Sequence, residues 1–182
     1  MTNETILIQQ LQNVKTKEKA YKELVSTYKE RLYWQIRRIV VNHEDADDVL
    51  QNTFIKIFKN IENFNQESKL FSWMYRIATN ESITFINKRA KHRNLDIADY
   101  QKELSSNLAE DPYFSGDQIQ LILQKAIATL PQKQQLVFNM KYFGELTYNE
   151  ISEILETSVG ALKASYFHAV KKIESSIKQN TN

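Results

Sequence analysis

The sequence contains no cysteine, and among its 182 residues there are only three glycines and two prolines. Without cysteine, thiol catalysis, zinc fingers and a disulfide-bonded secreted scaffold are excluded. Glycine and proline together make up about 3% of the chain, against roughly 12% in average proteins, and tight β-turns depend on both residues. A β-sandwich or barrel is therefore poorly supported, and we expect an all-α fold.

Long apolar runs are also missing. The longest, such as residues 39–41, are far shorter than the ~20 residues of a membrane-spanning helix. The chain does not open with a basic segment followed by an apolar stretch, so we expect no signal peptide. No phosphate-cradling glycine-rich loop, nucleophile with its base, or metal-ligand set appears either. We expect a cytoplasmic monomer that is not an enzyme, needs no cofactor or metal and does not insert into membranes.

Charge is unevenly distributed along the chain, although the formal net charge is only +2. Residues 1–94 hold 16 basic and 11 acidic side chains. Residues 95–118 hold one basic and six acidic side chains, and residues 119–182 hold seven basic and five acidic ones. The acidic segment has weak helical periodicity and contains Asp111-Pro112 and Ser115-Gly116. We predict two small helical domains, 1–94 and 119–182, joined by a flexible acidic linker over 95–118. The alternative is a short helix within that linker, near residues 100–108.

Apolar spacing predicts three helices in the first domain: one from about Lys17, one opening at the acidic cluster 44–48, and one over about 70–89. The third helix buries one face and presents Trp73, Arg76 and Asn80 on the other. An aromatic ring, a cation and an amide in line are typical of surfaces that hold single-stranded nucleic acid. A core role for Trp73 is the alternative interpretation.

The second domain has the pattern of a helix-turn-helix unit. Thr147-Tyr148-Asn149-Glu150 is a capping box that opens a short helix, a turn follows near residues 156–158, and a long helix runs from Val159 to about Ile177. Two helices joined by a short turn, the second of them basic, form the arrangement that reads duplex DNA.

The long last helix has two faces of different character. At about 100° per residue, one face is apolar and packs, while the opposite face carries Ala164, Phe167, His168 and Lys171, flanked by Lys163 and Ser165. An outward Phe beside His and Lys suits a major groove, where apolar groups meet thymine methyls and cations meet purines or phosphates. Gly160 in the first turn allows close backbone approach. The alternative is that this face binds a protein partner.

Three blocks of the sequence, residues 45–54, 71–80 and 128–172, resemble in this order the extracytoplasmic-function group of bacterial sigma-70 factors. The resemblance implies that the first domain, region two, binds core RNA polymerase and melts the minus-ten promoter element. It also implies that the second domain, region four, reads the minus-thirty-five element. Core RNA polymerase and promoter DNA are thus the implied partners, and an anti-sigma factor is a further candidate. The alternative is a helix-turn-helix regulator that binds duplex DNA without replacing the sigma subunit.

The resemblance also assigns residues, position by position. Those implied to bind polymerase are Asp45, Asp47, Asp48, Gln51 and Asn52, for which helix capping is the simpler structural role of the carboxylates. Those implied to hold the single-stranded minus-ten element are Phe64, Asn65, Ser68, Lys69, Trp73, Arg76, Asn80, Lys88 and Arg89. Those implied to contact the minus-thirty-five element are Ser158, Gly160, Lys163, Ala164, Ser165, Phe167, His168 and Lys171. Ser165 and His168 stand where many members have Arg, so a bidentate Arg–guanine contact is excluded there.

Overall fold

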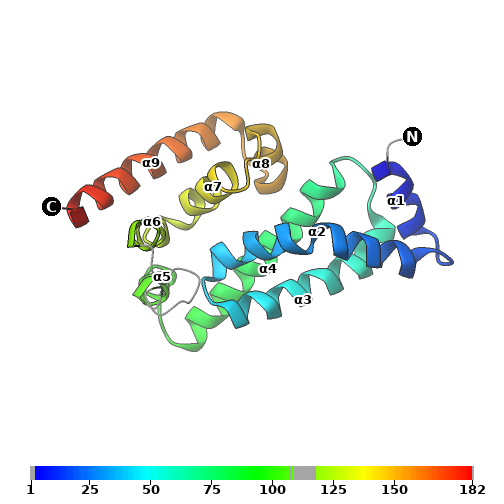
Figure 1. The fold of residues 1–182 in the computed structure, drawn as a ribbon, viewed down its shortest axis with the longest axis horizontal. Helices are drawn as coiled ribbons and strands as arrows, with labels where there is room; N and C mark the ends of the chain where they lie inside the picture. The colour runs from blue at the N-terminus through cyan, green and yellow to red at the C-terminus, as the bar shows by residue number, and fades with distance from the viewer. Residues whose placement is uncertain (1–2, 107, 109–117, 182) are drawn as a thin grey trace.

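The computed structural model describes residues 3–106, 108 and 118–181, and every regular element over these residues is helical. The elements are α1 (Asn3–Gln12), α2 (Lys17–Val40), α3 (His43–Asn60), the 3₁₀ turn η1 (Ile61–Asn63), α4 (Leu70–His92), α5 (Ile97–Ser106), α6 (Gln118–Ala128), α7 (Gln132–Tyr142), α8 (Tyr148–Leu155) and α9 (Val159–Thr181). The expected all-α fold is confirmed (Figure 1). Helix α1 precedes the first helix that periodicity predicted and is an addition to it.

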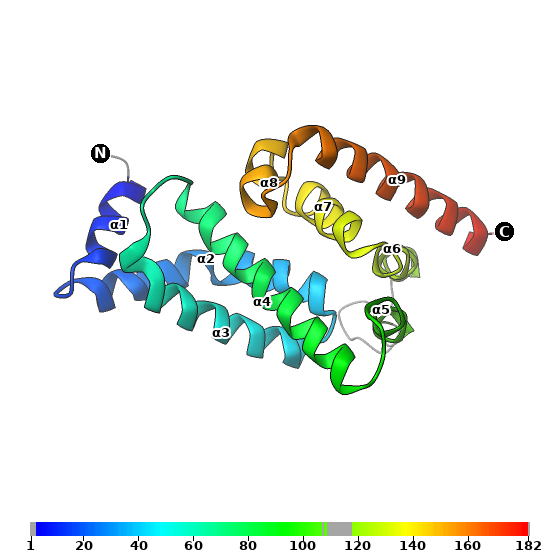
Figure 2. The same ribbon diagram turned by 180° about the vertical axis from the view of Figure 1, so that it is seen from behind.

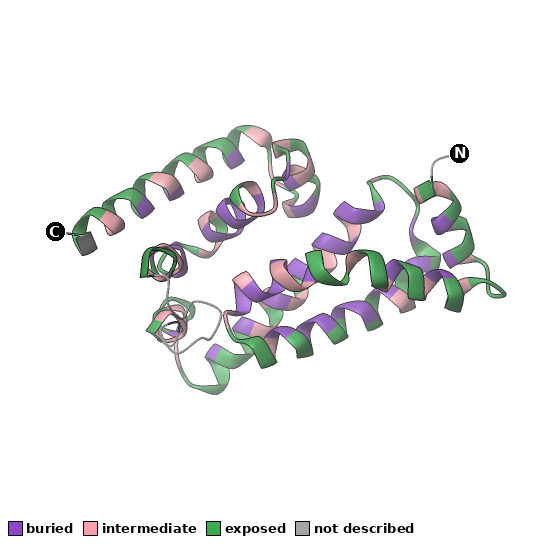
Figure 3. Ribbon diagram, in the orientation of Figure 1, coloured by how far each residue is buried: buried purple, intermediate pink, exposed green. Residues whose placement is uncertain are grey.

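Helices α2, α3 and α4 pack side by side as a bundle, and α1 lies across one end of it (Figures 1 and 2). The apolar residues at i, i+3 and i+4 spacing supply the bundle core, where Leu24, Ile36, Ile57 and Met74 are fully buried. Figure 3 shows this division as buried inner faces and exposed outer faces. The three helices begin close to where the sequence predicts, and their apolar stripes are buried largely against each other.

Capping explains the sharp junction between α2 and α3. The side chain of Asn42 accepts a hydrogen bond from the Asp45 N–H at 3.0 Å, and Glu44 and Asp45 lie in the first turn. Carboxylates in the first turn stabilise the positive end of the helix dipole. The acidic cluster therefore has a structural role at this junction, whatever else it binds.

The second domain contains α6 to α9. Phe138, Ala169 and Ile173 form a small core with Ile127 and Leu130, which joins α6 and α7 to α9. The predicted capping box is present: the Thr147 hydroxyl accepts from the Glu150 N–H, and the Glu150 carboxylate accepts from the Thr147 N–H. Helix α8 ends at Leu155, and Glu156 follows in the left-handed conformation with φ 50°. This residue makes the turn of the helix-turn-helix.

Part of the expected linker is helical. Residues 97–106 form α5, as the alternative predicted, because Tyr100 is buried and Leu104 packs beside it one turn later. Glu103 forms an ion pair with Arg93 at the end of α4, and α5 contacts both α4 and α6. The flexible-linker expectation is corrected for this stretch. Its remainder, 107 and 109–117 with Pro112 and Gly116, lies outside the described residues.

The two domains share one apolar cluster. Leu136, Met140, Ile151 and Ile154 of the second domain belong to the same buried cluster as the core of the first. Helix α8 packs on α4 and α7 packs on α2. The helix-turn-helix domain thus lies along one side of the first domain, as both ribbon views show (Figures 1 and 2).

The capping box predicts a measurable contribution to stability. We expect Thr147→Ala to lower the free energy of unfolding by about 1 kcal/mol, because the Glu150 N–H loses its acceptor. Thr27→Ala is the matched control: Thr27 is exposed in the middle of α2, where Ala is the better helix former, so that variant should be no less stable than wild type. Urea denaturation of both variants checks this, and equal stability of Thr147→Ala and wild type would contradict it.

Candidate nucleic-acid interface

Helix α9 has the two faces that its spacing predicts. Leu162, Ala169 and Ile173 are buried against the rest of the second domain, and Tyr166 is partly buried. On the opposite side, Phe167 is 54% exposed. A single exposed phenylalanine is common on protein surfaces, so the character of this face depends on the residues around it.

The residues around Phe167 are accessible, and two of them are lysines. Lys163, Ala164, His168 and Lys171 are exposed and Ser165 is partly exposed. The Lys171 ammonium lies 4.5 Å from the Phe167 ring centroid, and the His168 ring lies 5.7 Å from it. One apolar ring flanked by cationic and hydrogen-bonding side chains can contact thymine methyls and phosphates at the same time.

The first turn of α9 is open. A Cβ built on Gly160 would meet nothing within 4 Å, so this glycine is not required by packing. The Ser158 hydroxyl accepts from the Ala161 N–H at 3.4 Å, and Ser158 is exposed. First-turn N–H groups that have no acceptor within a helix can donate to a phosphate.

In the first domain, Phe64 differs from its expected role. Its side chain is only 4% exposed and belongs to the core, and its ring packs against Trp73 with the two ring centroids 5.1 Å apart. Its carbonyl accepts a hydrogen bond from the Gln12 amide at 2.9 Å. The resemblance implies that Phe64 holds the single strand, and in this structure its ring is buried against Trp73 and leaves little surface for a base. Of the neighbouring loop residues, Asn65 and Lys69 are exposed and Ser68 is partly exposed.

The three residues expected in line on α4 share a face but differ in surroundings. Trp73 and Arg76 are partly exposed, and Asn80 is exposed. Arg76 and Asn80 line a cavity of about 290 Å³ whose opposite wall comes from the second domain, including Gln132, Lys133 and Ile154. The expected strand-binding face of α4 therefore faces α7 and α8.

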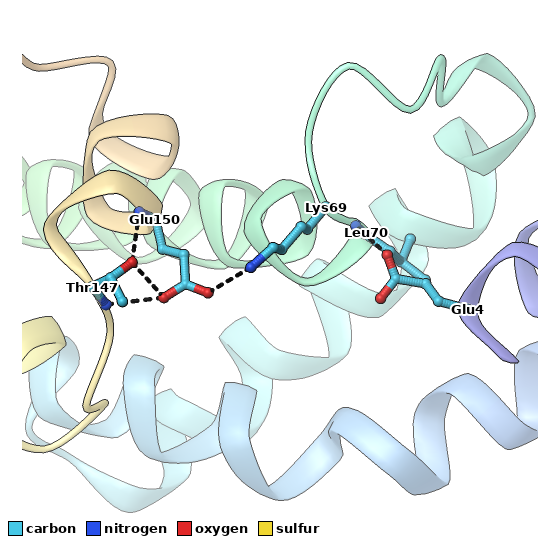
Figure 4. A network of polar contacts seen from close by, with 5 residues as sticks. All are labelled: Glu4, Lys69, Leu70, Thr147 and Glu150. Carbon is cyan, nitrogen blue, oxygen red and sulfur yellow. Dashed lines mark hydrogen bonds and ion pairs between the residues drawn. The ribbon is translucent and has the colours of Figure 1, made fainter. Parts of the chain in front are cut away.

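Two ion pairs cross this boundary, and Figure 4 shows the one between Lys69 and Glu150. The Lys69 ammonium lies 3.1 Å from the Glu150 carboxylate, and the Arg76 guanidinium donates to the Glu156 carboxylate at 3.0 Å. A second guanidinium nitrogen of Arg76 donates to the Glu153 carbonyl at 2.5 Å. Sequence reasoning missed these acidic partners, because they lie some 80 residues away along the chain.

The Lys69–Glu150 pair perturbs both groups. The hydrogen bond and charge of Glu150 raise the pKa of Lys69. The hydrogen bond from the Thr147 N–H, together with those from the Thr147 hydroxyl and Lys69, lowers the pKa of the Glu150 carboxyl, whereas desolvation opposes this. On the other side of Lys69, the Glu4 carboxylate accepts from the Leu70 N–H at 3.2 Å, which caps α4 from α1 (Figure 4).

The basic end of α4 is remote from this boundary. Lys88 and Arg89 are exposed, and the Arg89 guanidinium pairs with Asp45 at 2.9 Å. The Asp45 side chain is thus directed to α4, and the structure separates it from the other residues expected to bind polymerase.

Three of those other residues do gather. Asp47, Asp48 and Gln51 line an open groove of about 530 Å³ between α2 and α3, whereas Asn52 is exposed but lies outside the lining. The floor of the groove is apolar, with Leu50, Phe54 and Ile55. Ile55 is 45% exposed and was not expected in the site. In the sequence, Ile55 could have been noticed as an isoleucine that lies outside the apolar stripe of its helix.

Within the described part of the chain, no group of three or more His, Cys, Asp or Glu residues is placed to hold a metal ion. No helix of the same residues combines the length and apolar character that a membrane span requires.

The two domains match two known families. Residues 24–92 match Sigma-70 region 2, and residues 120–173 match Sigma-70, region 4. The chain is 31% identical over 152 residues to the ECF RNA polymerase sigma factor SigW of Bacillus subtilis, covering 79% of this chain and 81% of that protein. It is 27% identical to the ECF RNA polymerase sigma-E factor of Haemophilus influenzae, covering 88% of each.

Solved structures share the fold. One is CnrH in complex with the cytosolic domain of CnrY, with a TM-score of 0.70, 19% identity and 97% of each chain covered. Another is the sigma factor RpoE in complex with the anti-sigma factor NepR from Bartonella quintana, with a TM-score of 0.69, 19% identity, and 88% of this chain and 98% of that one covered. With both regions in family order and this identity to SigW, the chain belongs to the extracytoplasmic-function RNA polymerase sigma factors of the sigma-70 family.

Proposed function

We propose that this protein binds core RNA polymerase and directs it to specific promoters, where it recognises and helps to melt the DNA. The observation that carries the proposal is the presence in one chain of a helix-turn-helix with an exposed apolar and cationic face and a separate region 2. It acts through binding and not as an enzyme, and its place of action is the cytoplasm, with RNA polymerase. An anti-sigma factor is a further proposed partner, because two proteins of this fold are described in complexes of that type or with a cytosolic partner domain.

In this proposal α9 reads the minus-thirty-five element. Phe167 supplies an apolar contact to the major groove, and Lys163 and Lys171 neutralise phosphates. The open first turn at Ser158 and Gly160 binds a phosphate of the DNA backbone. Since Ser165 and His168 provide no guanidinium, shape and backbone contacts carry more of the specificity than base edges do.

The α4 face holds the separated minus-ten strand. Trp73, supported by Phe64, offers a ring on which a base can stack, while Arg76, Asn80 and the basic end at Lys88 and Arg89 follow the backbone. Stacking on a protein ring offsets an unpairing cost of a few kcal/mol, so strand separation can be driven by binding energy.

The groove between α2 and α3 is the proposed polymerase contact. Its apolar floor, with exposed Ile55, supplies hydrophobic area, and the rim is charged and polar, with Asp47, Asp48 and Gln51 facing Lys29 of α2. This combination of an apolar centre and a polar rim is common in protein interfaces. A regulator that binds duplex DNA alone would not need such a groove, which disfavours the alternative function.

Run-off transcription tests the proposal directly. The purified chain added to core RNA polymerase should start transcripts at a cognate promoter, whereas core enzyme alone should not. Failure with every promoter from the source genome, using chain shown to be folded, would refute it.

Trp73→Ala should reduce open-complex formation by about tenfold or more while leaving duplex binding nearly unchanged, because base stacking contributes about 1–3 kcal/mol per base only after strands separate. Permanganate reactivity of promoter thymines and duplex binding by the same holoenzyme measure the two steps. Trp73→Phe is the control and should keep most of the open complex. An equal loss in both steps would contradict the stacking role.

Lys171→Ala should weaken minus-thirty-five binding across sequences and reduce the slope of log affinity against log salt by about one, as loss of one phosphate contact does. Lys125→Ala, which removes an equal charge from an exposed position on α6, should leave the slope unchanged. A salt titration of duplex binding compares them, and an unchanged slope for Lys171→Ala would reassign this face to a protein partner.

A further inference from the structure

A cavity of about 240 Å³ lies where the end of α2 meets α6 and α7. None of its described lining residues belongs to the sets proposed to contact DNA or polymerase, so the proposed function leaves it unused. Both domains supply its walls, and the residues that carry its chemistry are Trp34, Arg37 and Arg38 of α2, Gln124 of α6, Gln135 of α7, and Phe143 directly after α7. A molecule bound here would touch both domains at once.

The described lining of this cavity is cationic. It contains two arginines and three glutamines and no acidic side chain. Two of these polar residues are deeply buried, Arg37 at 6% exposure and Gln135 at 3%. A neighbouring cavity of about 200 Å³ shares Arg38 but is also lined by Glu30 and Arg31, so its charges are mixed. Of the two, the first cavity is therefore the one suited to an anion.

The cations of the cavity lie next to flat aromatic rings. The Arg38 guanidinium carbon is 4.6 Å from the Phe143 ring centroid and 5.7 Å from that of Trp34, within the range of cation–π attraction. Arg37 donates a hydrogen bond to the Tyr33 hydroxyl. A guanidinium has five N–H donors, so it can serve more than one acceptor. The rings and guanidinium planes together offer flat surfaces on which another ring can stack.

The volume of the cavity sets the size of the ligand. Pockets for drug-sized molecules span roughly 300–1,000 Å³, so about 240 Å³ leaves room for one ring with an acid group and not for a nucleotide. The planar fork of Arg matches a carboxylate through two parallel N–H···O bonds. The amides of Gln124 and Gln135 can donate and accept, which suits a polar substituent on the ring. These features together specify a small, flat aromatic carboxylate.

The backbone beside the cavity is strained. Val41, which follows α2 and lines the cavity, has φ 67°, a left-handed conformation that a β-branched residue rarely adopts. Such strain persists only where the surrounding structure holds it in place, and it clusters at sites that bind ligands. The conformation of Val41 therefore agrees with a binding role for this end of α2.

We propose that this cavity is a binding site for a small aromatic carboxylate, whose acid group pairs with Arg37 and Arg38 and whose ring stacks against Trp34 and Phe143. The bound acid joins α2 to α6 and α7 and so stabilises their packing. The inference goes beyond the proposed function and does not rest on it, since neither DNA nor polymerase takes part.

Fluorine NMR of 4-fluorobenzoate with the full chain tests the site. The fluorine signal should shift and broaden in a saturable manner, with an affinity of about millimolar, as expected for so small a ligand. 4-Fluorobenzamide has the same shape without the charge and should bind about tenfold more weakly or worse. Acetate has the charge without the ring and should not displace 4-fluorobenzoate at the same concentration. Absence of saturable binding, or equal binding of the amide, would overturn the proposal.

Variants locate the bound molecule. Arg38→Gln should weaken 4-fluorobenzoate binding by about tenfold or more, because it removes one partner of a partly buried charge pair. Gln124→Ala should weaken it severalfold, because the second domain supplies one wall. Lys22→Gln is the matched control, since it removes a positive charge from an exposed position on α2 outside the cavity, and it should bind as wild type does. If Arg38→Gln and Lys22→Gln bind equally well, the molecule lies elsewhere and the proposal fails.

Thermal unfolding compares each variant with its own ligand-free form, so it stays informative even if Arg38→Gln is less stable. At ten times its Kd, 4-fluorobenzoate should raise the Tm of wild type by about 3–6 °C. The same concentration should raise the Tm of Arg38→Gln by less than half as much, and an equal rise would contradict the assignment. A negative result here leaves the run-off transcription prediction standing, and failure of run-off transcription leaves the ligand site standing.

Discussion

The apolar contact between the two domains is the interaction on which the rest of the arrangement depends. Leu136, Ile151 and Ile154 join the core of the first domain, and a buried aliphatic side chain of this size contributes about 1.5–3 kcal/mol. The ion pairs beside them are largely exposed and contribute about 0–1 kcal/mol each. Packing therefore supplies most of the attraction, whereas the charges fix where α8 lies along α4. That register is what brings Glu150 and Glu156 onto Lys69 and Arg76.

The helices were predictable where a long apolar stripe had to be buried, as in α2, α4 and α9, and where a cap marks the start, as Thr147 does for α8. Helix α5 is less evident, because a single buried tyrosine and its neighbour carry its packing and the stretch is otherwise polar. Helix α1 is short, and contacts with distant residues hold it in place: its Glu4 accepts a hydrogen bond from the Leu70 N–H, and its last residue, Gln12, donates to the Phe64 carbonyl. Local sequence patterns cannot predict contacts between residues so far apart in the chain.

The same distinction holds for the site. The exposed face of α9 follows from helix geometry alone, so Phe167 and Lys171 were placed correctly on it by spacing. Phe64 lies in an irregular segment without periodicity, so nothing local shows that its ring turns inward onto Trp73. Asp45 shares an acidic cluster with Asp47 and Asp48, yet Arg89 draws it to α4. Charge signs in a sequence show what can pair, and only the tertiary fold decides which pairs form.

The boundary between the domains is also built so that it can open without unfolding either one. The hydrogen bonds that order α8 are internal to it: Thr147 and Glu150 cap each other, and separation removes only Lys69 from that carboxylate. Gln35 of α2 and Asn139 of α7 are buried on helices that meet across the boundary, and their side-chain amides have no hydrogen-bond partner among the described residues. A buried polar group without a hydrogen-bond partner destabilises the packed state by about 1–3 kcal/mol, and this penalty disappears when the group becomes exposed and binds water. Closed packing is therefore favourable but weaker than its apolar area implies, because opening restores hydration to these amides while the caps and the separate core of α6, α7 and α9 remain.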